Sequence, residues 1–187
     1  MVSVNSIFEE LADTSSRLEK EAILKKNSTN DVFKRAIFLA LDPYTQFYIR
    51  KIPKYTPNSK KGIDLKFALD TLNDLSSRRI TGNAAIDFLR DTLEALNIED
   101  AKVLERVIEK DLRCGVSEAT VNKIWKNLVP TYPCMLASGY EDKLVNKIQF
   151  PAIAQLKLDG MRFNAIIKNG AVEFRSRNGK LLNLLSH

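Results

Sequence analysis

The sequence predicts a mainly helical protein whose C-terminal part changes to a short antiparallel β segment. Apolar residues recur every three or four positions up to about residue 130, which is the period of helices with one buried face. After residue 150 they come in short runs and alternations typical of strands. Asn169-Gly170, between two of these runs, favours a two-residue hairpin turn. We therefore expect a helical domain over residues 1–130, a linker over 131–149, and the first strands of an α+β domain over 150–187.

Length and composition are those of a globular protein. The chain has 187 residues, of which 44% are hydrophobic and 28% charged. Because no apolar run approaches the ~20 residues that span a bilayer, and the N-terminus lacks the features of a signal peptide, we expect a cytoplasmic protein with no membrane contact. Cys114, Cys134 and the single His187 are not spaced as zinc ligands, so no metal site of that kind is predicted. The net charge of +6 favours a polyanionic partner.

Helices of the predicted first domain follow from amphipathic spacing and from residues that begin or end helices. Ser15 or Ser16, and later Ser117, are expected to cap the stretches after them, and Asp42-Pro43 ends another. Gly115 is expected to be a left-handed cap at the end of the helix before it, and the spacing places Leu18 on an inner face. The expected helices cover about residues 7–12, 16–26, 31–41, 65–76, 84–96, 100–113 and 118–125, with short elements at 45–49 and 141–147.

Basic residues concentrate in a loop that contains two prolines and a glycine. Residues 50–66 hold six Lys and Arg against one acid, Asp64. Tyr48 and Tyr55 interleave aromatic rings with this charge, which is typical of a nucleic-acid-binding edge. An ordinary solvated loop fits the same pattern, and both interpretations stay open.

Two turns that lead into helices could hold phosphates through their main chain. A helix N-terminus presents unpaired N–H groups and the positive end of the helix dipole. Each turn adds arginine and glycine just before a helix. The residues are Arg78, Arg79, Thr81, Gly82 and Asn83 in the first turn, and Arg113, Gly115 and Ser117 in the second. Such contacts would bind the DNA backbone without reading bases; simple capped turns are the alternative.

Strands are expected at residues 150–157, 161–168 and 171–176. Between the first two strands the sequence places Lys157, Asp159, Gly160 and Arg162. Apolar flanks would desolvate Lys157, which favours its neutral amine and makes it a better nucleophile. Gly160 allows a tight turn or the close approach of a ligand, and Arg162 offers a planar donor fork for phosphate or ribose oxygens. From spacing alone, a surface Lys–Asp pair on a hairpin is the alternative.

These motifs resemble a known enzyme family. Lys157–Arg162 matches the Lys-x-Asp-Gly-x-Arg signature of the covalent nucleotidyltransferases, which comprise DNA ligases, RNA ligases and mRNA capping enzymes. Ser176–Gly179 resembles the family's second conserved element, one hairpin later. Residues 80–86, 111–117 and 135–138 resemble the DNA-binding domain and linker of ATP-dependent DNA ligases, particularly those of tailed phages. The resemblance implies a DNA-binding domain over 1–130 and, from residue 150, an incomplete nucleotidyltransferase (adenylation) domain.

The resemblance also implies roles for individual residues. Lys157 would attack the α-phosphate of ATP and become a lysyl-AMP, from which AMP passes to the 5′-phosphate of a nick. Asp159 would orient the lysine or a bound metal, normally Mg²⁺. Arg162 would hold the ribose, Arg177 would lie near the nucleotide or the nick phosphate, and the main chain at 155–156 would border the adenine. The implied nucleotide-binding residues are Gln155, Leu156, Asp159, Gly160, Arg162 and Arg177.

Parts of the family pattern do not occur in the sequence. A downstream glutamate for the ribose, a Lys-x-Lys element and an OB-fold domain do not follow the motif, so we expect that the 187-residue chain alone does not seal nicks. Two other readings stay open. One is an RNA ligase or capping enzyme, against which the long helical domain argues. The other is a non-catalytic module that binds DNA or docks a partner.

The expected partner is duplex DNA with a nick, bound by a monomer. A replication clamp or another replication protein is a further candidate partner. ATP and Mg²⁺ are the expected cofactors, and NAD is not expected, because NAD-dependent ligases carry a different N-terminal domain.

Overall fold

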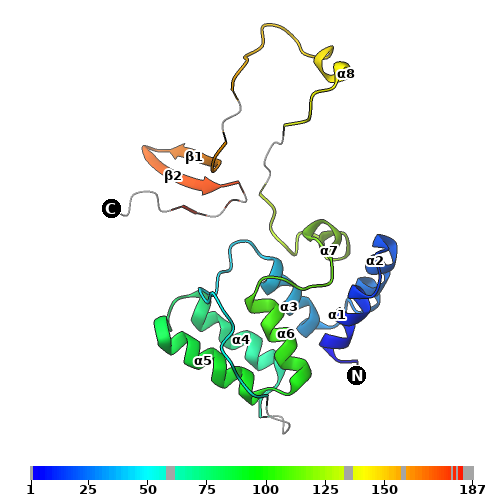
Figure 1. The fold of residues 1–187 in the computed structure, drawn as a ribbon, viewed down its shortest axis with the longest axis vertical. Coiled ribbons are helices and arrows are strands. Elements are labelled where there is room, and N and C mark those ends of the chain that lie inside the picture. The colour runs from blue at the N-terminus through cyan, green and yellow to red at the C-terminus, as the bar shows by residue number, and fades with distance from the viewer. Residues whose placement is uncertain are drawn as a thin grey trace. The chain divides into compact units, whose positions relative to one another are not determined.

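The computed structural model describes residues 2–57, 62–132, 137–156, 159–177, 179 and 181–182. The chain divides into two compact units, Met1–Pro130 and Thr131–His187. The described part is mostly helical and ends in an antiparallel pair of strands (Figure 1), which confirms the predicted fold class. Among the described helices, none is long and apolar enough to cross a membrane.

The helices of the first unit begin where capping residues precede amphipathic stretches. They are α1 (Val4–Ala12), α2 (Arg17–Lys26), α3 (Asp31–Leu41), α4 (Leu65–Ser76), α5 (Gly82–Ala95), α6 (Ile98–Ile108) and α7 (Glu118–Ile124). In all but α5, a side-chain oxygen at the cap accepts an N–H of the first turn, which satisfies one of the unpaired donors there. These caps are Ser3, Ser16, Asn30, Asp64, Asn97 and Ser117. The cap predicted at Ser117 is thereby confirmed, and of the two candidates Ser15 and Ser16 the structure selects Ser16.

Helix α6 organises the packing of the first unit, because it contacts α1, α3, α4 and α5 (Figure 1). Val103, Leu104 and Val107 of α6 are completely buried. Phe33 of α3 contacts two other rings, Phe8 at 5.2 Å and Trp125 at 6.2 Å between ring centres. Burial of each such side chain contributes about 1.5–3 kcal/mol, so α6 is the element against which the others are positioned.

The second unit contains α8 (Asp142–Val145), β1 (Phe163–Lys168) and β2 (Ala171–Ser176). The strands pair antiparallel, from Phe163 opposite Ser176 to Lys168 opposite Ala171. Asn169 and Gly170 have φ angles of 51° and 79°. Both central residues of a type I′ turn need positive φ, so the predicted hairpin turn is confirmed.

The end of α6 differs from the prediction. The helix ends at Ile108 and not near Arg113. Lys110 adopts the left-handed conformation (φ 60°), its N–H donates to Val107 O (3.2 Å), and the Asp111 N–H donates to Arg106 O (3.0 Å). This is the Schellman pattern of a helix end, with lysine in place of the usual glycine. The expectation that Gly115 caps this helix is therefore wrong.

Three further expectations differ from the structure. Residues 150–156 do not form a strand, and Ile153 and Leu156 are 89% and 91% exposed. The apolar spacing of this segment is typical of a strand, but a strand also needs a hydrogen-bonded neighbour. Residues 45–49 are irregular. Leu18 is exposed and Leu24 is buried, because α2 packs on α1 and α7 through another face than its spacing suggested.

Candidate nucleic-acid interface

The turn after α4 presents a stacked arginine–tyrosine pair. Arg78 has a φ of 59° and ends α4, with its N–H donating to Leu75 O (3.1 Å). Its guanidinium carbon lies 4.8 Å from the ring centre of Tyr48, whose own φ is 58°. Both residues are exposed. Left-handed backbone costs a non-glycine residue about 1–2 kcal/mol, and such strain is often found at functional sites.

The start of α5 follows directly. Thr81 occupies the cap position of α5 but makes no side-chain capping hydrogen bond. Gly82 adopts a φ of 61°, and Thr81, Gly82 and Asn83 are all exposed. Arg79 forms an ion pair with Asp74 (2.6 Å) at the surface. The N-terminal end of this 14-residue helix therefore faces solvent beside two arginines.

The turn from Asp111 to Ser117 carries the second predicted set. The Arg113 N–H donates to Asp111 Oδ1 (2.8 Å), and the Arg113 guanidinium forms an ion pair with Glu109. The hydrogen bond from its guanidinium to Glu109 raises the pKa of Arg113, which keeps the guanidinium charged. Gly115 has a φ of 60°, and Ser117 Oγ accepts the Thr120 N–H (3.4 Å). Arg113, Gly115 and Ser117 are exposed.

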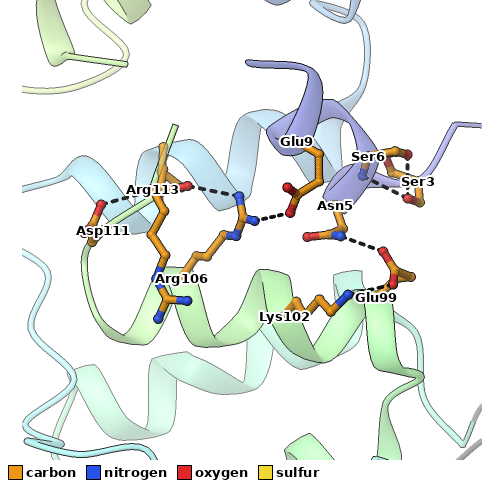
Figure 2. Close-up of polar contacts among 10 residues, drawn as sticks. Ser3, Asn5, Ser6, Glu9, Glu99, Lys102, Arg106, Asp111 and Arg113 are labelled. Atoms are coloured by element: carbon orange, nitrogen blue, oxygen red, sulfur yellow. Dashed lines mark hydrogen bonds and ion pairs between the residues drawn. The ribbon is translucent and has the colours of Figure 1, made fainter. Parts of the chain in front are cut away.

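A buried arginine, Arg106, donates a hydrogen bond to the main chain of this turn. Arg106 is 8% exposed and its ring-facing guanidinium lies 5.6 Å from the centre of Phe8. It donates to Leu112 O (3.1 Å) and forms an ion pair with Glu9 of α1. Figure 2 shows Arg106 reaching from α6 to Glu9, with Asp111 and Arg113 of the turn beside it.

An open groove of about 790 Å³ lies next to both turns. It is lined by Gln46, Phe47, Tyr48, Ile49, Arg50, Lys51, Ile52, Ile108, Glu109 and Lys110. Tyr48 contacts Arg78 of the first turn, and Glu109 pairs with Arg113 of the second. Two predicted sets that are separated in sequence therefore flank one groove, whose lining includes Arg50, Lys51 and Lys110 as cations.

Lys110 and Tyr55 make contacts that the sequence does not predict. Lys110 Nζ donates to Leu39 O (2.6 Å) and Asp42 O (2.7 Å), which fixes the segment that leads to Tyr48. Tyr55, one of the two rings that interleave with the basic loop, is half-buried, with its hydroxyl donating to Glu105 (2.9 Å). Burial, and then this carboxylate, raise the pKa of Tyr55 well above its usual range. No sequence signal marks either contact, because the partners are distant in the chain.

The predicted nucleotide-binding residues belong to the second unit. Lys157 lies outside the described residues. Gln155, Leu156, Asp159, Gly160, Arg162 and Arg177 are exposed. Arg162 and Arg177 immediately flank the terminal strand pair of Phe163 and Ser176, so the hairpin brings them to the same end. One described residue of each motif, Arg162 and Arg177, therefore lies at this end of the hairpin.

Comparison with known proteins connects this geometry to a family. The family model "DNA ligase N terminus" matches residues 44–126. The DNA ligases of Enterobacteria phages T4 and T6 are each 40% identical to the chain over 177 residues, which is 89% of this chain and 35% of theirs. The chain belongs to the DNA ligase family.

Solved structures agree with this membership. The structure named Pmar-Lig_PreS3 is 34% identical with a TM-score of 0.74, and Pmar-Lig_Pre is 32% identical with a TM-score of 0.76. Each likeness covers 97% of this chain and 43% of the other. The chain thus corresponds to the N-terminal region of a phage-type ATP-dependent DNA ligase and spans about a third of the length of those phage ligases. Both turns and the groove lie within the segment that the ligase family model matches.

Proposed function

We propose that the first unit of this ligase binds nicked duplex DNA through the sugar–phosphate backbone. The observation that carries the proposal is the groove, because two exposed turns rich in arginine and glycine flank it and cations line it. Phosphates attract Lys and Arg regardless of base sequence, and main-chain N–H groups add directed hydrogen bonds. The proposed DNA-binding residues are Arg78, Arg79, Thr81, Gly82, Asn83, Arg113, Gly115 and Ser117.

Fluorescence anisotropy with a labelled nicked duplex tests this proposal. We expect the logarithm of the binding constant to fall linearly with the logarithm of the salt concentration. The slope should be about −0.9 for each phosphate contact. Duplexes of different sequence should bind with similar affinity. An absence of binding at low salt, or a strong preference for one sequence, would contradict the proposal.

We also propose that the second unit contributes the nucleophile of ATP-dependent nick sealing. The Lys157 amine would attack the α-phosphate of ATP, forming a P–N bond while the bond to the β-phosphate breaks and pyrophosphate leaves. Arg162 and Arg177 support this, because guanidinium groups at one end of the hairpin suit phosphate and ribose oxygens. The Asp159 carboxylate is a donor of the type that Mg²⁺ prefers, and a bound Mg²⁺ would supply charge neutralisation of the phosphates.

A chimaera tests the catalytic proposal. This chain would replace the matching region of the phage T4 ligase, and the product would be incubated with α-labelled ATP and Mg²⁺. We expect covalent labelling and nick sealing that Lys157→Ala abolishes and that Lys168→Ala, a lysine of the same hairpin, leaves intact. Labelling that survives Lys157→Ala would show that another residue is the nucleophile. DNA binding without any labelling would favour a non-catalytic DNA-binding module.

A further inference from the structure

Cations from two other elements hold the carbonyl groups of the turn between α6 and α7. Lys20 Nζ, from α2, donates to Cys114 O (2.7 Å) and Gly115 O (3.3 Å). Arg106, from α6, donates to Leu112 O (3.1 Å). Hydrogen bonds from charged donors are stronger than those between neutral groups. The orientation of the peptide groups in this turn is therefore set by side chains of α2 and α6.

This orientation decides where the turn's N–H groups point. In a planar trans peptide the C=O and the following N–H point in opposite directions. Because the Cys114 carbonyl is directed at Lys20, the Gly115 N–H is directed away from Lys20. Gly115 and its neighbour Arg113 are exposed. A main-chain N–H in an exposed turn can donate a hydrogen bond to an anion.

The fit between Lys20 and the turn depends on glycine. A Cβ atom at Gly115 would lie 2.7 Å from Lys20 Nζ, which is closer than real contacts allow. The absence of a side chain at Gly115 is thus what allows the ammonium group to reach both carbonyl oxygens.

Helix α2 is itself fixed to the far side of the turn. Lys123 of α7 forms an ion pair with Glu21 of α2 (2.6 Å), and the Trp125 Nε1–H donates to Ser28 O (3.2 Å), just after α2. The hydrogen bond from Lys123 also lowers the pKa of Glu21. Because these contacts do not involve Lys20, removal of the Lys20 ammonium should leave α2 in place.

We propose that Lys20 is a positioning residue for DNA binding, which holds the carbonyls of Cys114 and Gly115 so that the turn directs the Gly115 N–H toward the phosphate backbone. The role rests on the proposed function of the first unit. It assigns a role in DNA binding to α2, which lies outside the segment that the ligase family model matches. Lys20 acts through the turn and does not itself contact DNA.

Substitution of Lys20 in the 187-residue chain tests this role, with a labelled nicked duplex as the probe. Lys20→Met should weaken binding roughly tenfold, the scale of a lost charge-assisted hydrogen bond. The salt slope should stay unchanged, because no phosphate contact is lost. Lys25→Met is the matched control, since it removes the same charge from an exposed position of the same helix; it should bind like the unaltered chain. Lys20→Arg, which keeps a charged donor, should restore most of the affinity.

Nuclear magnetic resonance of the unbound chain gives a second readout. The amide signals of Gly115 and Val116 should shift in Lys20→Met and not in Lys25→Met. Lys20→Gln keeps a neutral N–H donor, so its DNA affinity and its amide shifts should lie between those of Lys20→Met and the unaltered chain. This variant also provides the test if Lys20→Met does not fold.

Three results would overturn the positioning role. The first is that Lys20→Met binds DNA as well as Lys25→Met does, although the unaltered chain binds DNA. The second is a fall in the magnitude of the salt slope by about one phosphate contact, which would make Lys20 a direct ligand. If the unaltered chain binds no DNA, the proposed function fails first, and the positioning role fails with it.

Discussion

Four residues around the proposed interface have left-handed backbone although none is glycine. Tyr48, Arg78, Lys110 and Arg113 have φ angles between 52° and 60°. Each lines the groove or flanks it. Glycine would relieve the conformational cost at such positions, but it would supply neither an aromatic ring nor a positive charge. The interface is therefore a place where side-chain chemistry outweighs backbone preference.

The role of Arg78 can be measured directly. Arg78→Ala should weaken binding of the chain to duplex DNA by a similar factor on every sequence and reduce the magnitude of the salt slope by about 0.9, because one phosphate contact is lost. Arg35→Ala is the control, since Arg35 also lies over an aromatic ring (5.9 Å from the centre of Phe38) but outside the proposed set. A loss confined to one DNA sequence, or an equal loss in Arg35→Ala, would contradict the assignment.

The raised pKa of Tyr55 predicts how stability depends on alkaline pH. Because folding raises the pKa above its ordinary value of 10.0 through burial and the Glu105 carboxylate, the neutral phenol is favoured in the folded state. Its stabilising contribution is complete below about pH 10 and is lost as the pH rises further. Urea unfolding at about pH 8 and about pH 11 should show a decline that is smaller in Tyr55→Phe.

The exposed Tyr44 provides the control for this measurement. Tyr44→Phe should retain the full alkaline decline, because Tyr55 is still present. Equal declines in Tyr55→Phe and in the unaltered chain would contradict the assigned cause.

At the level of elements, the ends of α3 and α6 are joined by one lysine. Lys110 Nζ donates to Leu39 O and Asp42 O and lies 5.7 Å from the ring centre of Phe47. The carbonyls at the end of α3 have no partner in their own helix, so a donor from α6 replaces water there. The segment from Asp42 to Tyr48 is thereby held beside α6, which forms the other wall of the groove.

Removal of this donor should destabilise the first unit. Lys110→Met keeps much of the aliphatic length but leaves two carbonyls without their donor, so we expect the free energy of unfolding to fall by about 1–3 kcal/mol. Lys102→Met, which loses only a surface ion pair with Glu99, should change it by less than about 1 kcal/mol. Urea unfolding of both variants makes the comparison, and similar losses in the two would show that Lys110 is an ordinary surface lysine.

At the scale of the whole molecule, the packed core belongs to the first unit. Within the part of the chain that the structure describes, every buried hydrophobic residue lies between Val4 and Val129. The hairpin of the second unit exposes apolar side chains, including Ile167 (73%) and Val172 (52%). Because stability comes mainly from buried apolar surface, the first unit should not require the second in order to fold.

A shortened chain tests this independence. Residues 1–130 alone should unfold cooperatively, at a midpoint within a few degrees of the longer chain, and should bind nicked duplex DNA within about threefold, a difference below roughly 1 kcal/mol. Circular dichroism and fluorescence anisotropy measure the two properties. Loss of cooperative unfolding would show that the units fold together, whereas cooperative unfolding without binding would place DNA contacts in the second unit.

Local signals in the sequence predicted most of the helices and the hairpin. Capping at Ser16 and Ser117 and the Asn169-Gly170 turn are properties of a few neighbouring residues, and the structure confirms them. The end of α6 could not be predicted in this way, because Lys110 occupies a left-handed position that favours glycine. The strand predicted at 150–157 is absent from its described residues, 150–156. Strand formation depends on pairing with a neighbouring strand, which local sequence does not determine.

The sequence by itself determined the helical class, the turn of the hairpin and the membership in the DNA ligase family, because periodicity, caps and motifs act over short distances along the chain. Only the tertiary structure decided that the two basic turns flank one groove, that Tyr48 stacks on Arg78, and that Lys20 holds the turn at Gly115. Each of these contacts joins residues far apart in sequence. Such contacts form only when helices pack, and no local pattern records which side chains will then meet.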